Sequence, residues 1–163
     1  MKHTISILVE NHAGVLSRVS GLFSRRGFNI DSLAVGITDD PTISRITIVV
    51  DGNDYTVEQV EKQLNKLIDV IKLKRLLPEE TISRELMLIK VECSPKTRGD
   101  IMDVARVMEA KVCDISKTTM TIEISDTCER IEIIMELLLP YKILEVVRTG
   151  TIALEKGTNI IKA

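Results

Sequence analysis

The residues with the clearest potential for chemistry lie in one short segment, ENHAGVL at positions 10–16. An amide side chain (Asn11), an imidazole (His12) and a glycine (Gly14) stand directly before a stretch with helical periodicity. The segment contains no serine or cysteine that His12 could activate, and no lysine of the kind found in phosphate-binding loops. The segment therefore favours binding over catalysis.

The start of the predicted helix is suited to a carboxylate. The first amides of a helix have no partners within it, and the helix dipole adds partial positive charge there. Amides near Gly14, Val15 and Leu16 can receive an anion, which approaches closely because Gly14 has no side chain. Asn11 offers a donor and an acceptor, and Ala13 with the first helical residues forms a small apolar wall. This suits a free amino acid, although Asn11 and Gly14 can equally shape a tight turn and nothing more.

No other set of residues assembles a predicted active site or metal site. The Asp39-Asp40 pair precedes a proline and is typical of a turn, since no third carboxylate follows at a ligand spacing. The phosphate-binding patterns GxGxxG and GxxxxGK[ST] do not occur, so a nucleotide site is not expected. We therefore predict no catalytic residue, no metal and no cofactor in this chain.

Composition restricts the class of protein. The chain has 163 residues, of which 44% are hydrophobic and only 2% aromatic, so its core is aliphatic. The net charge is −2 with both signs interleaved, so a nucleic-acid partner is not expected. No segment approaches about 18 consecutive apolar residues, so we expect a cytoplasmic protein without membrane association. Cys93, Cys113 and Cys128 form no CxxC pair and are predicted to be buried free thiols.

The first half of the chain has the predicted order βαββαβ. Apolar periodicity indicates strands at residues 3–10, 30–38, 43–51 and 70–76, with helices that open near Val15 and Thr56. Gly27 follows two arginines and is expected to end the first helix. Thr56 and Gln59 have the spacing of a capping box at the start of the second helix. The apolar stripe of that helix is expected to continue to Ile68.

The second half repeats this order, with strands at residues 85–92, 111–117, 119–125 and 142–148 and helices around Ile101 and Ile131. We therefore predict an α+β fold of two tandem ferredoxin-like domains, each with an antiparallel sheet and two helices on one face. The predicted boundaries are 1–77 for the first domain, 78–83 for a linker and 84–163 for the second domain, with residues 151–163 as its short tail.

Two other functions are known for this element order. RNA-recognition modules stack bases on aromatic residues of their central strands, but Phe23 lies on a predicted helix and no aromatic residue lies in mid-strand. Acylphosphatase-type catalysis needs an arginine in the loop after the first strand, whereas the nearest arginine, Arg18, lies within the helix. Neither function is predicted.

A long block, ENHAGVLSRVSGLFSRRGFNIDSLAVGITDDPTISRITIVV, resembles ACT domains, which are regulatory modules that sense amino acids. Together with VEQVEKQLNKLIDVIKL, SRELMLIKV and the closing EVVRTGTIAL, it makes the whole chain similar to the small regulatory subunits of acetolactate synthase. The resemblance implies that catalysis belongs to a separate large subunit, which uses thiamine diphosphate, magnesium and FAD. That subunit condenses two pyruvates, or pyruvate with 2-oxobutyrate.

The resemblance also implies a regulatory role. The small subunit raises the activity of the large one and makes it sensitive to a branched-chain amino acid, usually valine. ACT modules of this kind pair side by side, so a homodimer is expected with the effector at its seam. The implied effector-binding residues are Asn11, His12, Ala13, Gly14, Val15 and Leu16 of one copy with Asn29 and Ile30 of the other. The alternative is a free-standing amino-acid-sensing ACT protein that regulates a different enzyme.

On the second predicted strand, Ser32, Ala34 and Gly36 place small residues along one face. Such a face tolerates close approach of a neighbour, and a plain exposed face is an equal explanation.

Overall fold

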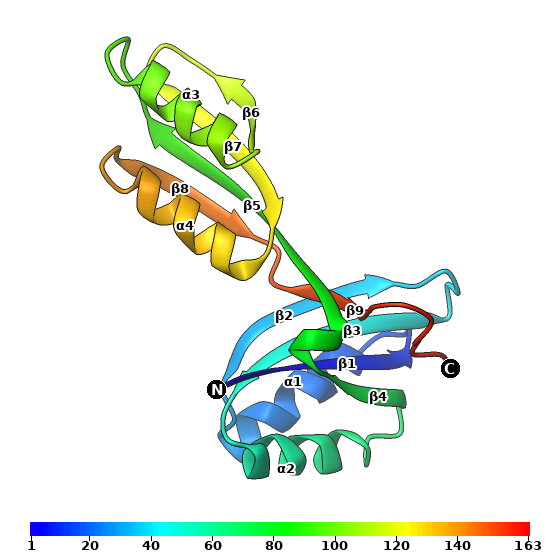
Figure 1. The fold of residues 1–163 in the computed structure, drawn as a ribbon. Helices are drawn as coiled ribbons and strands as arrows, with labels where there is room; N and C mark the ends of the chain where they lie inside the picture. Colours follow the sequence, from blue (N-terminus) through cyan, green and yellow to red (C-terminus); the bar gives the residue numbers. More distant parts are fainter. The chain divides into compact units, whose positions relative to one another are not determined.

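The computed structural model describes residues 1–163 and divides into two units, Met1–Ile82 with Thr151–Ala163, and Ser83–Gly150. Each unit has the order strand, helix, strand, strand, helix, strand (Figure 1). The α+β class and the two ferredoxin-like units are therefore confirmed. No helix in either unit is both long and apolar enough to cross a bilayer.

The first unit contains a four-stranded sheet with the strand order β2-β3-β1-β4. Its elements are β1 (Lys2–Glu10), α1 (Val15–Arg26), β2 (Ile30–Ile37), β3 (Ile43–Asp51), α2 (Asp54–Leu64) and β4 (Val70–Leu76). Neighbouring strands are antiparallel, with Ile5 of β1 opposite Ile48 of β3. β2 and β4 are the two edge strands.

Both helices cover one face of this sheet (Figure 1), because alternate strand residues and one stripe of each helix are apolar. The fully buried members of this core include Ile5, Ile7, Ile46, Ile48, Val19, Phe23, Val57, Val60 and Leu64. The predicted stripe is too long, because α2 ends at Leu64 and both Leu67 and Ile68 lie outside the helix. Leu67 still packs against the core, whereas Ile68 is 94% exposed.

The ends of the helices follow the predicted signals with one exception. Gly27 is left-handed at the end of α1, with φ of 70°, and the Phe28 amide donates to Phe23 O over 3.1 Å. The start of α2 differs from the prediction, since its N-cap is Asn53, whose Oδ1 accepts the Thr56 amide at 2.8 Å. The N-cap predicted at Thr56 is therefore wrong, because Asn53, three residues earlier, takes this role with its side-chain oxygen.

The tail of the chain lies against the face of the first sheet that carries no helix. The sequence predicts that residues 151–163 extend the second domain, but they belong to the first unit. In the short strand β9 (Ile152–Glu155), Ala153 O accepts a 2.9 Å hydrogen bond from Arg45 Nη2. Glu155 forms a 2.8 Å ion pair with Lys74 Nζ. Through these contacts the tail packs on β3 and β4 of the first unit.

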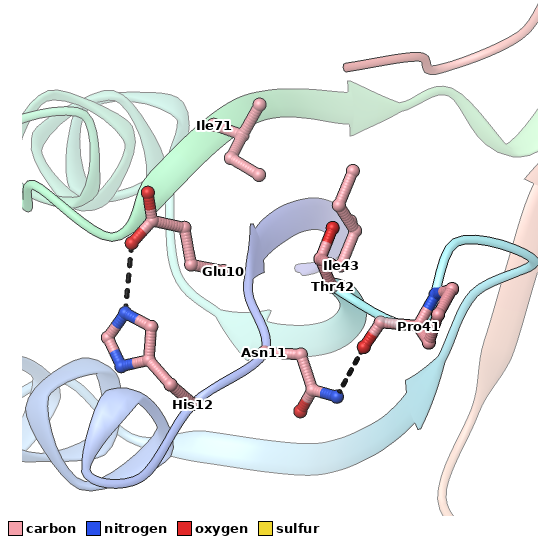
Figure 2. A pocket seen from close by; sticks show the side chains of 7 residues that line it. All are labelled: Glu10, Asn11, His12, Pro41, Thr42, Ile43 and Ile71. Atoms are coloured by element: carbon pink, nitrogen blue, oxygen red, sulfur yellow. Dashed lines mark hydrogen bonds and ion pairs between the residues drawn. The ribbon is translucent and has the colours of Figure 1, made fainter.

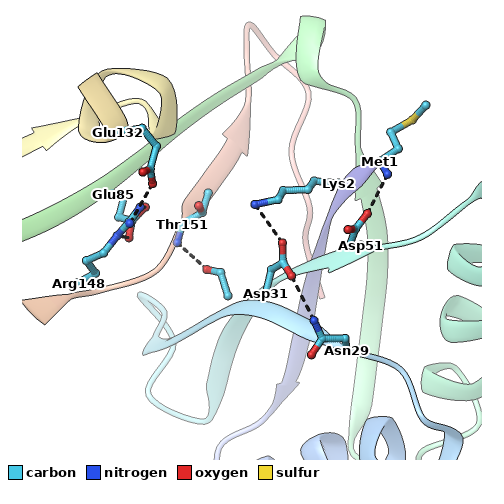
Figure 3. Close-up of polar contacts among 10 residues, drawn as sticks. Met1, Lys2, Asn29, Asp31, Asp51, Glu85, Glu132, Arg148 and Thr151 are labelled. Atoms are coloured by element: carbon cyan, nitrogen blue, oxygen red, sulfur yellow. Dashed lines mark hydrogen bonds and ion pairs between the residues drawn. The ribbon is translucent and has the colours of Figure 1, made fainter. Parts of the chain in front are cut away.

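The tail contacts one of the three small residues on the face of β2 that Ser32, Ala34 and Gly36 share. Ser32 Oγ accepts a 2.9 Å hydrogen bond from the amide of Thr151 (Figure 3). Ala34 is half-buried, whereas Gly36 at the far end of the strand is exposed. This face is therefore not plainly exposed, because its first residue meets the chain's own tail.

The second unit has the strand order β6-β7-β5-β8. Its elements are β5 (Thr81–Glu92), α3 (Arg98–Val107), β6 (Lys111–Ile115), β7 (Thr119–Asp126), α4 (Cys128–Leu138) and β8 (Ile143–Arg148). The predicted linker is mostly regular structure: Pro78–Glu80 forms a short 3-10 helix, η1, and β5 begins directly after it. The buried core includes Met87, Ile89, Val91, Ile101, Met120, Ile122, Ile131 and Ile134.

A buried carboxylate in this unit is satisfied by Arg148. The guanidinium donates through Nε and Nη2 to both oxygens of Glu85, at 2.7 and 3.0 Å, and through Nη1 to Glu132 at 2.9 Å (Figure 3). Glu85 is only 5% exposed, so its charge depends on this bidentate pair. The hydrogen bonds to Glu85 raise the pKa of Arg148.

The cysteines differ from the prediction. All are free, but only Cys93 is buried, whereas Cys113 and Cys128 are exposed. Cys113 lies on the edge strand β6 and Cys128 is the first residue of α4, and neither belongs to the buried core of the second unit.

Candidate functional site

The loop between β1 and α1 leaves the start of the helix without a side-chain cap. Gly14 has φ of 87°, a left-handed conformation that is strained for residues with a β-carbon. A β-carbon there would also stand 2.9 Å from Arg18 Nη1. The first hydrogen bond of α1 runs from the Arg18 amide to Gly14 O over 3.0 Å. The amides before it have no partner within the helix and suit an anion.

A cleft of about 440 Å³ opens at this loop. Its lining residues are Glu10, Asn11, His12, Pro41, Thr42, Ile43 and Ile71 (Figure 2). They come from the end of β1, the turn between β2 and β3, and the beginning of β4. Polar groups and two isoleucines share the lining, which is typical of a site for a small molecule with both polar and aliphatic parts.

Asn11 is fixed by the turn between β2 and β3. Its Nδ2 donates to Pro41 O and its backbone amide to Thr42 O, both at 2.8 Å (Figure 2). Asp40 in turn accepts the Thr42 hydroxyl at 2.7 Å and the Thr42 amide at 2.9 Å, and these bonds lower the pKa of its carboxyl. Asp40 thus shapes the turn, as predicted. One of the two Nδ2 hydrogens of Asn11 is used in this way, which leaves the second hydrogen as a donor and Oδ1 as an acceptor.

A cluster of ionisable side chains lies at the end of β1. His12 Nε2 is 2.9 Å from Glu10 Oε2 and 3.4 Å from Asp69 Oδ1. Arg18 Nε donates to Asp69 Oδ2 over 2.6 Å, and the Asp69 side chain is only 6% exposed. The hydrogen bond with Glu10 raises the pKa of His12, and the bond from Arg18 lowers the pKa of Asp69. The cluster therefore joins the loop to the beginning of β4.

The predicted effector residues of the loop have unequal access to the cleft. Asn11 and His12 line it, and Ala13 and Gly14 follow on the exposed surface. The Val15 side chain is 4% exposed and belongs to the core, so only its backbone can reach a ligand.

Leu16, the last predicted residue of the loop, is 43% exposed but does not line the cleft.

Asn29 and Ile30 lie at the other end of the sheet within one chain. Ile30 is opposite Val50 near the end of β3, whereas Glu10 is opposite Ile43 at its beginning. Seven residues of strand separate these positions, a distance of roughly 20 Å. One copy of the chain therefore does not bring all eight predicted residues into one site.

Two family models match the chain. The model described as AHAS small subunit-like ACT domain matches residues 5–72, and the model described as small subunit of acetolactate synthase matches residues 84–157. The probable acetolactate synthase small subunit of Archaeoglobus fulgidus is 47% identical over 159 residues, which cover 98% of this chain and 99% of that protein. The chain belongs to the acetolactate synthase small-subunit family.

Other members of the family agree with this assignment. The acetolactate synthase small subunit of Mycolicibacterium smegmatis is 48% identical over 161 residues, covering 99% of this chain and 95% of that protein. The crystal structure of the small subunit from Thermotoga maritima matches with a TM-score of 0.90 at 37% identity, over 98% of this chain and 99% of that chain. Membership confirms the resemblance read from the sequence. It identifies a regulatory ACT-domain subunit, in a family where catalytic activity belongs to the large subunit.

The sequence alone does not connect Glu10 or Arg18 with Asp69, because these residues are far apart along the chain. The element order could have predicted this contact, because the last strand of a βαββαβ unit pairs antiparallel with the first. Asp69 directly precedes β4 and therefore meets Glu10 at the end of β1.

Proposed function

We propose that the chain binds a branched-chain amino acid, with valine the expected effector, at a seam between two copies of its first unit. Without effector it raises the activity of a separate large catalytic subunit of acetolactate synthase, and with effector it confers feedback inhibition. The observation that carries this proposal is the uncapped start of α1 beside an amphipathic cleft, in a member of this family.

Each part of an amino acid has a complementary group in the first unit. The free amides at the start of α1 suit the carboxylate, which Gly14 admits because it has no side chain. Asn11 Oδ1 suits the ammonium, since the Asn11 Nδ2 group already donates to Pro41 O. Ile43 and Ile71 offer an apolar surface for an aliphatic side chain. These contacts support a branched-chain effector over a charged one.

The edge position of β2 supports a seam between two copies. Val35 and Ile37 on this strand are 47% and 65% exposed, which favours burial against a partner. If two β2 strands pair antiparallel about a two-fold axis, the first residues of one strand lie beside the last residues of the other. Asn29 and Ile30 of a second copy then approach the turn that holds Asn11. In such a pair, Asn29 and Ile30 of one copy lie close to the Asn11 loop of the other copy, although these regions are roughly 20 Å apart within one chain.

We further propose that this chain holds no cofactor of the reaction. Thiamine diphosphate, magnesium and FAD are assigned to the large subunit, where two pyruvates, or pyruvate with 2-oxobutyrate, condense. The isolated chain is then expected to form no acetolactate.

The decisive experiment mixes the purified chain with the large catalytic subunit and titrates valine, leucine and isoleucine. The expected result is a higher rate on addition of the chain and a rate that falls as valine is added. Saturating amounts of chain that leave the rate unchanged would instead favour a free-standing ACT sensor of another enzyme. Acetolactate formation by the chain alone, free of large subunit, would overturn the assignment of catalysis to the partner.

A further inference from the structure

We propose that Glu10, His12 and Asp69 form a binding site for one divalent transition-metal ion, with Zn²⁺ the best fit. One ligand atom from each of these side chains lies within 4.8 Å of the other two. The proposal goes beyond the regulatory role, because metal binding by this chain requires neither the catalytic subunit nor an amino acid.

The distances between ligand atoms are close to those of a tetrahedral zinc site. With metal–ligand bonds of about 2.0–2.1 Å, tetrahedral ligand atoms lie about 3.4 Å apart. His12 Nε2 is 2.9 Å from Glu10 Oε2 and 3.4 Å from Asp69 Oδ1. Small side-chain rotations of the exposed Glu10 and the half-exposed His12 are enough to open space for an ion.

The backbone holds these ligands together before any ion arrives. The Glu10 amide donates to Asp69 O over 3.0 Å, which ties the end of β1 to the residue before β4. The His12 amide donates to Glu10 O over 3.2 Å. Ligands on hydrogen-bonded strands lose little conformational freedom on metal binding, so the site is largely preformed.

Arg18 orients the buried ligand. Its Nε donates to Asp69 Oδ2 over 2.6 Å, while Asp69 Oδ1 faces His12. The two oxygens of this carboxylate are therefore divided between an orienting guanidinium and the position proposed for the ion. Partners of this kind fix ligand geometry and are typical of protein metal sites.

The ligand set selects the class of metal. Imidazole nitrogen suits Zn²⁺ and its transition-metal neighbours, whereas Mg²⁺ and Ca²⁺ prefer oxygen ligands alone. The carboxylates of Glu10 and Asp69 with the Arg18 guanidinium leave one net negative charge, which a divalent cation overcompensates. Glu10 and His12 also line the cleft of about 440 Å³, so a fourth ligand can come from water there.

The test measures Zn²⁺ affinity of the full chain by competition with a chromogenic chelator, and Co²⁺ binding by visible absorption. The exposed thiols Cys113 and Cys128 are the natural competitors for these ions, so a Cys113→Ser/Cys128→Ser chain is measured in parallel. We expect one ion per chain, no change in the cysteine variant, and visible Co²⁺ bands without a thiolate charge-transfer band.

His12→Gln removes the nitrogen ligand at a half-exposed position and is expected to weaken Zn²⁺ binding by about tenfold or more. Asp69→Asn is expected to weaken it as well, with circular dichroism to verify folding. Glu58→Gln, which removes an exposed acid on α2, is the control and should leave the affinity unchanged. Zn²⁺ binding that is absent, survives His12→Gln, or is lost in the cysteine variant would overturn the proposal.

Discussion

The loops that open the first helix of each unit hold the same place in the βαββαβ order but satisfy their backbones differently. No side chain caps the first helix of either unit, and in the first unit the residue before the helix, Gly14, is left-handed. In the second, the Ser94 amide donates to Thr97 Oγ1 at 2.9 Å, and the Thr97 and Arg98 amides donate to Ser94 O at 3.1 and 2.9 Å. The second loop therefore gives the first amide of its helix a partner in its own carbonyl, Ser94 O, whereas the first loop gives the first amide of α1 none.

This difference shows how a repeated fold can divide its roles without a change of topology. Ligand chemistry depends on loop residues, and the strands and helices only position them. We therefore expect effector binding in the first unit alone. Changes to the corresponding loop of the second unit should alter stability without altering the response to an amino acid.

The largest effect is expected for Gly14→Asp. The new carboxylate occupies the start of α1 and lies near Arg18, so an effector carboxylate loses both space and positive potential. A combined loss of ~3 kcal/mol weakens effector affinity roughly a hundredfold. Because φ at this position is 87°, the fold also loses about 1 kcal/mol or more. Valine titration of the assembled enzyme and thermal unfolding of the chain measure the two effects separately.

Gly14→Ala is the matched control for this prediction. Alanine has the same strain and the same contact with Arg18 but adds no charge. It should reproduce the loss of stability and only part of the loss of valine sensitivity. If Gly14→Asp folds and responds to valine like the parent, the effector carboxylate does not bind at the start of α1.

A second contrast concerns the sheet faces without helices. In the first unit the tail lies on this face, where Leu8 and Val49 are 4% and 8% exposed. In the second unit the corresponding face leaves Leu88 and Val147, which are paired across β5 and β8, 37% and 57% exposed. The tail therefore distinguishes the two units as much as the loops do.

Removal of residues 151–163 should destabilise the first unit by about 2–3 kcal/mol, because apolar side chains under the tail become exposed. Urea unfolding of the chain ended at Gly150 measures this loss. Glu155→Gln in the full chain is the control: it weakens the ion pair with Lys74 but keeps the covered surface, so a smaller effect is expected. Equal stability of the shortened and full chains would show that the tail contributes no packing.

Most of the fold could be predicted from sequence because it is encoded locally. Alternation placed β1, β3 and β4 close to their observed bounds, and Gly27 marked the end of α1. The contacts of the tail with the first unit could not be predicted, since a four-residue strand such as β9 does not specify which sheet face it covers. Its partners Arg45 and Lys74 are distant in sequence.

The candidate site was predictable only where one segment supplies it. The loop from Asn11 to Gly14 was found by its residue types. Asp69 and the lining residue Ile71 reach the site because β4 pairs with β1. Apolar periodicity predicts these strands but not the residue-by-residue register of their pairing. Val15 was predicted as an effector residue without regard to the burial of its side chain. Its place on the apolar stripe of α1 indicates this burial.

A smaller effect is expected for Asn29→Ala, which tests whether the first unit acts as a pair. Asn29 Nδ2 makes only a long 3.4 Å contact with Asp31 Oδ1 within its own chain, so it is available across a seam. Loss of its hydrogen bonds to an effector should cost about 1–2 kcal/mol, or roughly tenfold in valine affinity. Light scattering should show a dimer for both parent and variant. Asn65→Ala, at the end of α2, is the control and should change neither quantity.

The smallest effect is expected for Thr97→Ala in the second unit. The variant removes the acceptor of the Ser94 amide, and one hydrogen bond of this kind contributes about 1 kcal/mol to stability. Thr127→Ala, which removes the N-cap of α4, should cost a similar amount. Neither variant should change the valine concentration that half-inhibits the assembled enzyme. A shift in that concentration for Thr97→Ala, with none for Thr127→Ala, would show that the second loop also takes part in sensing.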